Sequence, residues 1–131
     1  MSESGWIGVD LDGTLAEYTE FVSYDHIGPP ISAMVERVRR WLTEGKDVRI
    51  FTARVAKDVR AIPYLNVWCE QHLGKALPVT CTKDYEMIEL WDDRCVQVIR
   101  NTGECMEEHA YYQGLQDGIE ISKKQQYVNT D

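Results

Sequence analysis

The sequence predicts an α/β fold in which a parallel five-stranded sheet is flanked by helices. Two observations lead to this prediction. Short apolar runs typical of buried strands alternate along the chain with longer segments whose apolar residues recur at helical spacing. The connections between them are short, which favours parallel strands joined by helical crossovers. The length of 131 residues fits one domain, which we expect over residues 1–121, with a polar tail over 122–131.

The first half of the chain is expected to contain one strand, a flap and one helix. The apolar run Trp6–Val9 predicts a buried strand that leads into a tight turn. Residues 16–30 show no such pattern and are expected to form a loop or small flap. Residues 31–42 have the apolar spacing of a helix, which Pro30 is well placed to open and Gly45 to end.

The second half is expected to continue the alternation. Residues 48–51 predict a strand, and residues 56–73 predict a helix that Pro63 interrupts or restarts. Further short strands are expected at 77–81, 87–91 and 96–99, and a last helix at about 104–118.

Charge and cysteine usage narrow the class of protein. The formal net charge of −8 disfavours non-specific binding to nucleic acid or to anionic membranes. No apolar run is long enough to span a bilayer, and the start of the chain does not resemble a secretory signal. The four cysteines are spread out without a CxxC pair. We therefore expect reduced thiols in a cytoplasmic protein.

Polar side chains follow several of the expected strands at the point where each strand ends. In open parallel sheets, ligands bind at the carboxyl ends of the strands. We therefore expect one edge of the sheet to gather Asp10, Asp12, Thr52, Arg54, Lys83, Asp92 and Asp93.

These residue types together indicate phosphate chemistry. Carboxylates that lie close together raise each other's pKa unless a cation lies among them. Mg²⁺ binds one or two carboxylates, waters and phosphate oxygens. Lys83 and Thr52 would supply a charge and a hydroxyl to those oxygens. A carboxylate can also act as the nucleophile and form an aspartyl-phosphate.

The motifs and their order resemble those of the haloacid dehalogenase superfamily of phosphohydrolases. Asp10–Ala16 (DLDGTLA) is similar to its first motif, and Ile50–Arg54 (IFTAR) to its second. Lys83 resembles the third-motif lysine, with Lys75 as the alternative, and Leu90–Arg94 (LWDDR) resembles the fourth motif. The resemblance implies a Rossmann-like fold of the small type that has no separate cap domain.

The resemblance also implies a role for each matching residue. Asp10 would be the nucleophile, and Asp12 would be the general acid and then the general base. Thr52 would bind the phosphoryl group, and Lys83 would hold that group together with Asp10. Mg²⁺ would be bound by Asp10, the main-chain carbonyl of Asp12, Asp92 and Asp93. The substrate-binding residues would be Thr52, Ala53, Arg54 and Lys83.

Several alternatives stay open at this point. Arg54 is equally consistent with a substrate contact and with a structural ion pair. A small phosphorylated metabolite is the favoured substrate, and a polynucleotide end is the alternative. The same residues also fit a phosphotransferase or a non-catalytic phosphate-binding module. The sequence does not define the oligomeric state.

Overall fold

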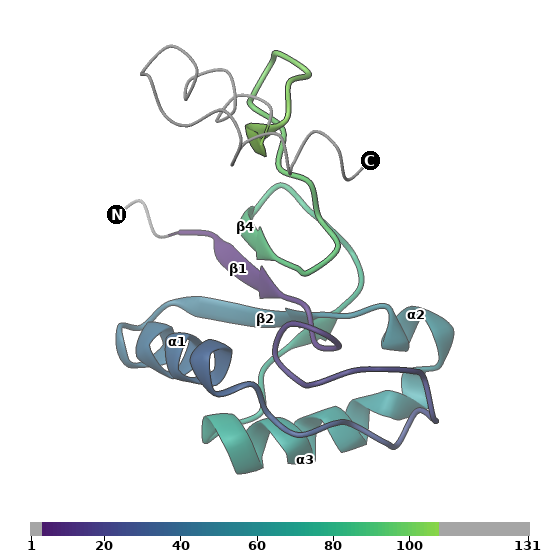
Figure 1. Ribbon diagram of the computed structural model, residues 1–131. Coiled ribbons are helices and arrows are strands. Elements are labelled where there is room, and N and C mark those ends of the chain that lie inside the picture. The colour runs from purple at the N-terminus through teal and green to yellow at the C-terminus, as the bar shows by residue number, and fades with distance from the viewer. Residues whose placement is uncertain (1–3, 108–131) are drawn as a thin grey trace. The chain divides into compact units, whose positions relative to one another are not determined.

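The computed structural model describes residues 4–107 and has a parallel α/β architecture (Figure 1). The four strands are β1 (Trp6–Val9), β2 (Asp47–Phe51), β3 (Val79–Thr80) and β4 (Met87–Trp91). They form one sheet in the order β3-β2-β1-β4, and every neighbouring pair is parallel. The first four strands expected from the sequence are thus confirmed, and their carboxyl ends lie at one edge of the sheet.

The helical segments lie between the strands as expected. They are α1 (Ser32–Thr43), α2 (Arg54–Lys57), the 3₁₀ turn η1 (Val59–Ala61) and α3 (Ile62–Leu73). Pro63 lies in the first turn of α3, where its missing N–H breaks no helical hydrogen bond. The helix expected over 56–73 is therefore three consecutive pieces, of which Pro63 opens the last.

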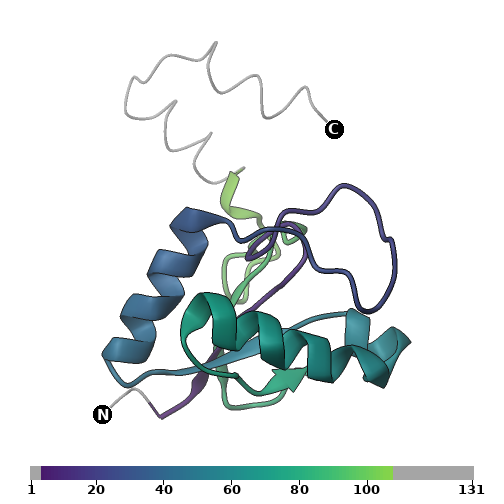
Figure 2. The same ribbon diagram turned by 90° about the horizontal axis from the view of Figure 1, so that it is seen from below.

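The hydrophobic core lies between the sheet and two helices. Helices α1 and α3 run along the same face of the sheet (Figures 1 and 2). One buried cluster joins alternate strand residues, Ile7, Val9, Val48 and Ile50, to helix residues that include Met34, Val38, Trp41, Leu65, Trp68 and Leu73. The alternation of side chains along a strand explains why these four residues share that face. This packed layer gives the strand ends a fixed position.

The flap predicted over residues 16–30 is a loop whose two ends are joined (Figure 2). Ala16 pairs with Pro30, and the Glu17 amide donates to the Pro29 carbonyl at 2.8 Å. Gly28 allows this close approach, because a Cβ at that position would collide with the Glu17 carbonyl oxygen. The Trp68 indole N–H on α3 donates to the Gly28 carbonyl at 3.0 Å, which anchors the base of the flap.

The prediction of a fifth strand at 96–99 is wrong. The chain falls into two compact units that divide after Asp93, and residues 96–99 belong to the second. There Val98 pairs with Cys105 in an isolated antiparallel bridge, and the Met106 amide donates to the Gln97 carbonyl at 2.8 Å. The apolar run therefore forms a local turn instead of joining the sheet, and Val96 and Val98 remain exposed.

Some expectations fall on residues that the structure does not describe. Most of the helix expected at about 104–118, the domain boundary at 121 and the tail over 122–131 lie outside residues 4–107. Within the described part, no helix combines the length and apolar character that crossing a membrane requires.

Candidate active site

The turn that follows β1 places two carboxylates at the sheet edge. The Asp10 amide donates to the Trp91 carbonyl at 2.9 Å, so the end of β1 is fixed beside the end of β4. The Leu11 carbonyl accepts from the amides of Leu15 and Ala16, both at 2.9 Å, which closes a tight turn. Leu11 and Leu15 are fully buried. Because these apolar side chains anchor the turn in the core, the polar residues between them are held at the edge.

Three of the expected acids lie together at this edge. Asp92 and Asp93 follow β4 directly, as Asp10 follows β1. Asp10, Asp92 and Asp93 each place one carboxylate oxygen within 4.8 Å of the others. Asp10 and Asp92 are partly buried, and Asp93 is exposed. The convergence that the sequence predicted for these three residues is confirmed.

Burial and this clustering together raise the pKa of Asp10, the candidate nucleophile. The pKa of Asp10 is raised from 3.8 to about 7, first by burial and then by the neighbouring charge of Asp92. A hydrogen bond to Asp93 and the charges of Asp93 and Asp12 raise it further. The carboxylates therefore repel one another, and a hard divalent cation with oxygen ligands would relieve that repulsion. The donor set and its electrostatics both fit Mg²⁺.

Gly13 and Thr14 support the same cluster, although the sequence argument gave them no role. The Thr14 hydroxyl lies 3.4 Å from Asp10 Oδ2 and 3.3 Å from Asp93 Oδ1, and it accepts from the Asp93 amide at 3.0 Å. Gly13 has φ +88°, and a Cβ there would lie 2.5 Å from Asp93 Oδ2. The signal that could have identified both residues is their place in the Asp-Gly-Thr segment of the first motif.

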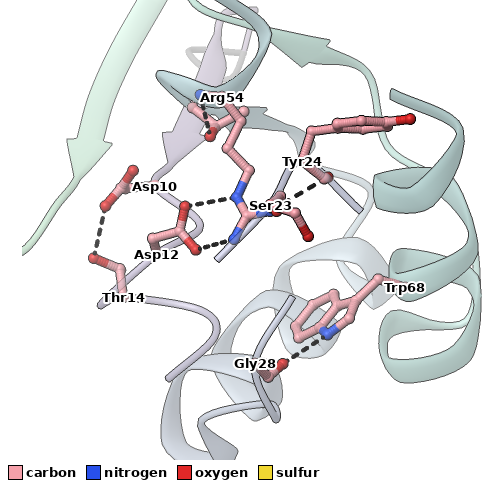
Figure 3. A network of polar contacts seen from close by, with 9 residues as sticks. Asp10, Asp12, Thr14, Ser23, Tyr24, Gly28, Arg54 and Trp68 are labelled. Atoms are coloured by element: carbon pink, nitrogen blue, oxygen red, sulfur yellow. Dashed lines mark hydrogen bonds and ion pairs between the residues drawn. The ribbon is translucent and has the colours of Figure 1, made fainter. Parts of the chain in front are cut away.

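The side chain of Asp12 has a different environment from that of Asp10. Its two oxygens accept from Arg54 Nε at 2.8 Å and from Arg54 Nη2 at 2.9 Å (Figure 3). This two-point geometry matches the planar guanidinium to the carboxylate. The side chains are only 5% and 19% exposed, respectively for Arg54 and Asp12, so solvent screens the pair weakly. Of the two sequence-based alternatives for Arg54, the structure shows the ion pair, and its partner is itself a site residue.

The remaining expected site residues differ in burial and in their contacts. Thr52 follows β2 and is buried, and its hydroxyl accepts from the Arg54 amide at 3.1 Å. Ala53 is exposed just before α2. Lys83 is exposed on the loop between β3 and β4, and no hydrogen bond or ion pair joins it to another residue of the described chain. Lys75, which lies between α3 and β3, is also exposed and has no such contact within the described chain. No contact therefore favours one lysine over the other as the third-motif residue.

Comparison with known proteins does not identify a family for this chain. No protein-family model matches the chain, and no curated protein matches it. A solved structure described as "the conserved protein coded by locus from Bacteroides thetaiotaomicron" aligns with a TM-score of 0.46 and 19% identity. The alignment covers 91% of this chain and 95% of that chain.

Proposed function

We propose that this protein is a Mg²⁺-dependent phosphohydrolase of the haloacid dehalogenase superfamily that hydrolyses a phosphate monoester through an aspartyl-phosphate on Asp10. The observation that supports the proposal is the grouping of Asp10, Asp92 and Asp93 within 4.8 Å at the carboxyl ends of parallel strands. Asp12 lies in the same turn, two residues beyond the nucleophile. A nucleophile, a cation site and an acid are the groups that this reaction needs.

In the first half-reaction, a carboxylate oxygen of Asp10 attacks the phosphorus atom. The bond between phosphorus and the ester oxygen breaks, and the leaving oxygen takes a proton from the Asp12 carboxyl. The product alcohol departs, and the phosphoryl group remains on Asp10. The acid is a residue other than the nucleophile, because the leaving oxygen and the attacking Asp10 oxygen lie on opposite sides of phosphorus.

In the second half-reaction, Asp12 accepts a proton from a water molecule. The resulting hydroxide attacks phosphorus, the bond to Asp10 breaks, and inorganic phosphate is released. Asp10 returns as a carboxylate and Asp12 returns as an acid, so the cycle closes without another reactant.

The acid cluster also supports the metal requirement. Asp10, Asp92 and the main-chain carbonyl of Asp12 would hold Mg²⁺, and Asp93 would orient Asp92 or a metal-bound water. When bound, Mg²⁺ supplies positive charge that offsets the negative charge of the phosphoryl group and of the cluster. Binding by Asp10 requires its ionised form, which the raised pKa of Asp10 disfavours without a cation.

Substrate binding is the role that we propose for Thr52, Ala53 and Lys83. Thr52 and Lys83 would donate to the phosphoryl oxygens, and Ala53 would lie against the substrate. The favoured substrate is a small phosphorylated metabolite, because the net charge of −8 opposes the approach of a polyanion.

The test is phosphate release from a panel of phosphate esters with Mg²⁺. The panel includes nucleotides, sugar phosphates and a 3′-phosphorylated oligonucleotide, and each ester is also run with Asp10→Asn and with EDTA. We expect release from at least one ester, and no release in either control. Release that persists in Asp10→Asn would overturn the nucleophile assignment.

Two other outcomes identify the alternatives. Transfer of the phosphoryl group to an added alcohol, without free phosphate in its absence, would identify a phosphotransferase. Binding of Mg²⁺ and phosphate without turnover of any ester would contradict the hydrolase and support a phosphate-binding module.

A further inference from the structure

Arg54 connects the candidate general acid to the flap. Its Nε and Nη2 atoms donate to the two oxygens of Asp12. Its Nη1 atom donates to the carbonyls of Ser23 at 3.3 Å and Tyr24 at 3.4 Å, both within the flap (Figure 3). One side chain from the start of α2 therefore bridges the turn after β1 and the loop over residues 17–29.

The guanidinium group is committed to these contacts. All three of its nitrogen atoms already donate to protein acceptors, and the whole residue is only 7% exposed. The main chain is held as well, because the Arg54 amide donates to the Thr52 hydroxyl at 3.1 Å. An arginine that binds a phosphoryl group must present its N–H groups to the ligand. In this structure those groups face Asp12 and the flap.

The flap also contacts Arg54 through an aromatic ring. The ring of Phe21, from the flap, lies 5.9 Å from the Arg54 guanidinium carbon and 5.2 Å from the Lys57 ammonium. A cation near the face of an aromatic ring is attracted to it, so Phe21 adds a second contact between the flap and Arg54.

We propose that Arg54 is a positioning residue that holds the Asp12 carboxyl in place for proton transfer and couples that placement to the flap through Ser23 and Tyr24. The proposal rests on the proposed phosphatase function. It replaces the sequence-based expectation that Arg54 binds substrate. It also gives the flap a role: an ordered flap keeps Arg54 in place, and Arg54 keeps the acid in place.

Such a role has a kinetic signature that phosphate binding lacks. Protonation of the leaving oxygen matters greatly for an alkyl phosphate, because an alkoxide is a poor leaving group. It matters little for p-nitrophenyl phosphate, because p-nitrophenolate leaves readily without a proton. Loss of the positioning residue should therefore lower kcat/KM, which reports the first half-reaction, unequally for the two esters.

The experiment compares Arg54→Ala and Arg54→Lys with the wild type on glycerol phosphate and p-nitrophenyl phosphate. For Arg54→Ala we expect kcat/KM on glycerol phosphate to fall about a hundredfold, and kcat/KM on p-nitrophenyl phosphate to fall less than about fivefold. Arg54→Lys keeps the charge without the two-point geometry and should lie in between. Wild-type protein that releases phosphate from neither these two esters nor any ester of the panel would refute the proposed function itself, a result that no variant can mimic.

Arg49→Ala is the matched control. Arg49 also makes a two-point pair, with Asp47 at 3.2 Å and 2.9 Å, but it lies on β2 away from the flap. We expect wild-type ratios between the two esters in this variant. An equal loss of kcat/KM on both esters in Arg54→Ala would show that Arg54 binds the phosphoryl group and would overturn the proposal.

The coupling to the flap is measured separately by amide hydrogen exchange over residues 17–29. Arg54→Ala and Asp12→Asn should both speed exchange there, although Asp12 is not part of the flap, and Arg49→Ala should not. Thermal unfolding verifies that each variant is folded. If Arg54→Ala does not fold, hydrogen exchange of the flap in Asp12→Asn tests the coupling instead. Unchanged flap exchange in Asp12→Asn would contradict the coupling.

Discussion

Asp10 and Asp12 belong to the same short turn but have opposite electrostatic environments. Asp10 is partly buried among carboxylates, and burial first and then the charge of Asp92 raise its pKa to about 7. Asp12, in its ionised form, makes a two-point ion pair with Arg54 at 2.8 Å and 2.9 Å. One turn therefore combines a carboxyl group whose surroundings disfavour its charge with one whose charge is paired with a guanidinium group.

The comparison distinguishes a candidate cation site from a structural ion pair. Repulsion among like charges costs stability, and folded proteins retain it where a ligand relieves it. The Asp12–Arg54 pair instead needs no ligand, because each partner compensates the charge of the other. The two carboxylates should therefore respond differently to every change of charge, pH and metal.

The largest effect is expected for Asp10→Asn. An amide cannot form the aspartyl-phosphate, so turnover should fall by at least about 10⁴-fold. The measurement is steady-state phosphate release with the best ester of the panel, together with thermal unfolding to verify the fold. Because the amide also removes a repelled charge, the metal-free variant should unfold at a higher temperature than the wild type at pH 8. An active variant would contradict the assignment of Asp10 as the nucleophile. A variant that unfolds at a lower temperature would contradict the unfavourable environment described for the Asp10 charge.

Asp12→Asn should have the next largest effect and the opposite effect on stability. Loss of the acid and base should reduce kcat on an alkyl phosphate by about 10³-fold. The variant also leaves the buried Arg54 guanidinium without its counter-charge, which should lower the free energy of unfolding by about 2 kcal/mol. Denaturant unfolding in EDTA measures whether Asp10→Asn and Asp12→Asn change the free energy of unfolding in opposite directions. Equal signs for the two substitutions would show that the environments of Asp10 and Asp12 do not differ as described.

The stability of the metal-free protein should depend on pH through Asp10. Between pH 4 and 7 the folded protein keeps a proton on Asp10 that the unfolded chain releases, because the pKa is 3.8 in the unfolded chain and about 7 in the folded protein. The stability that this proton contributes is fully present below pH 3.8 and is lost as the pH rises through about 7. After allowance for solvent screening we expect a loss of about 2–3 kcal/mol.

The check is the free energy of unfolding at several pH values with EDTA, in the wild type and in Asp10→Asn. The difference between the two proteins isolates the contribution of Asp10 from those of other groups. Saturating Mg²⁺ should remove most of the wild-type dependence, because binding favours the ionised carboxylate. Parallel curves for the two proteins would contradict the raised pKa.

The sequence predicted the positions of the candidate site residues best where those residues directly follow a strand. Asp10, Thr52 and Asp92 each follow a strand directly, and parallel strands bring their carboxyl ends to one edge. The apolar run at 96–99 shows the limit of such patterns, because a short apolar run cannot reveal whether its hydrogen-bond partners lie in the sheet or in a nearby turn. In this chain they lie in the turn.

The ion pair between Asp12 and Arg54 could not be chosen from the sequence. The two residues are far apart along the chain, and several carboxylates were candidate partners. Only the positions of the backbone decide which acid the guanidinium group reaches. The supporting role of Thr14 was also missed, because its hydroxyl acts on the main chain and side chain of Asp93, which comes from another strand end.

The smallest expected effect concerns that hydroxyl. Thr14→Val keeps the shape of the side chain but leaves the Asp93 amide without its acceptor. We expect a loss of about 1 kcal/mol in the free energy of unfolding and roughly fivefold weaker binding of Mg²⁺, because Asp93 is less well held beside Asp10. The control is Thr43→Val, which removes a hydroxyl that donates to the Arg39 carbonyl at 3.0 Å in α1. That variant should bind Mg²⁺ as the wild type does, so weaker binding in both variants would show that the effect does not arise at the acid cluster.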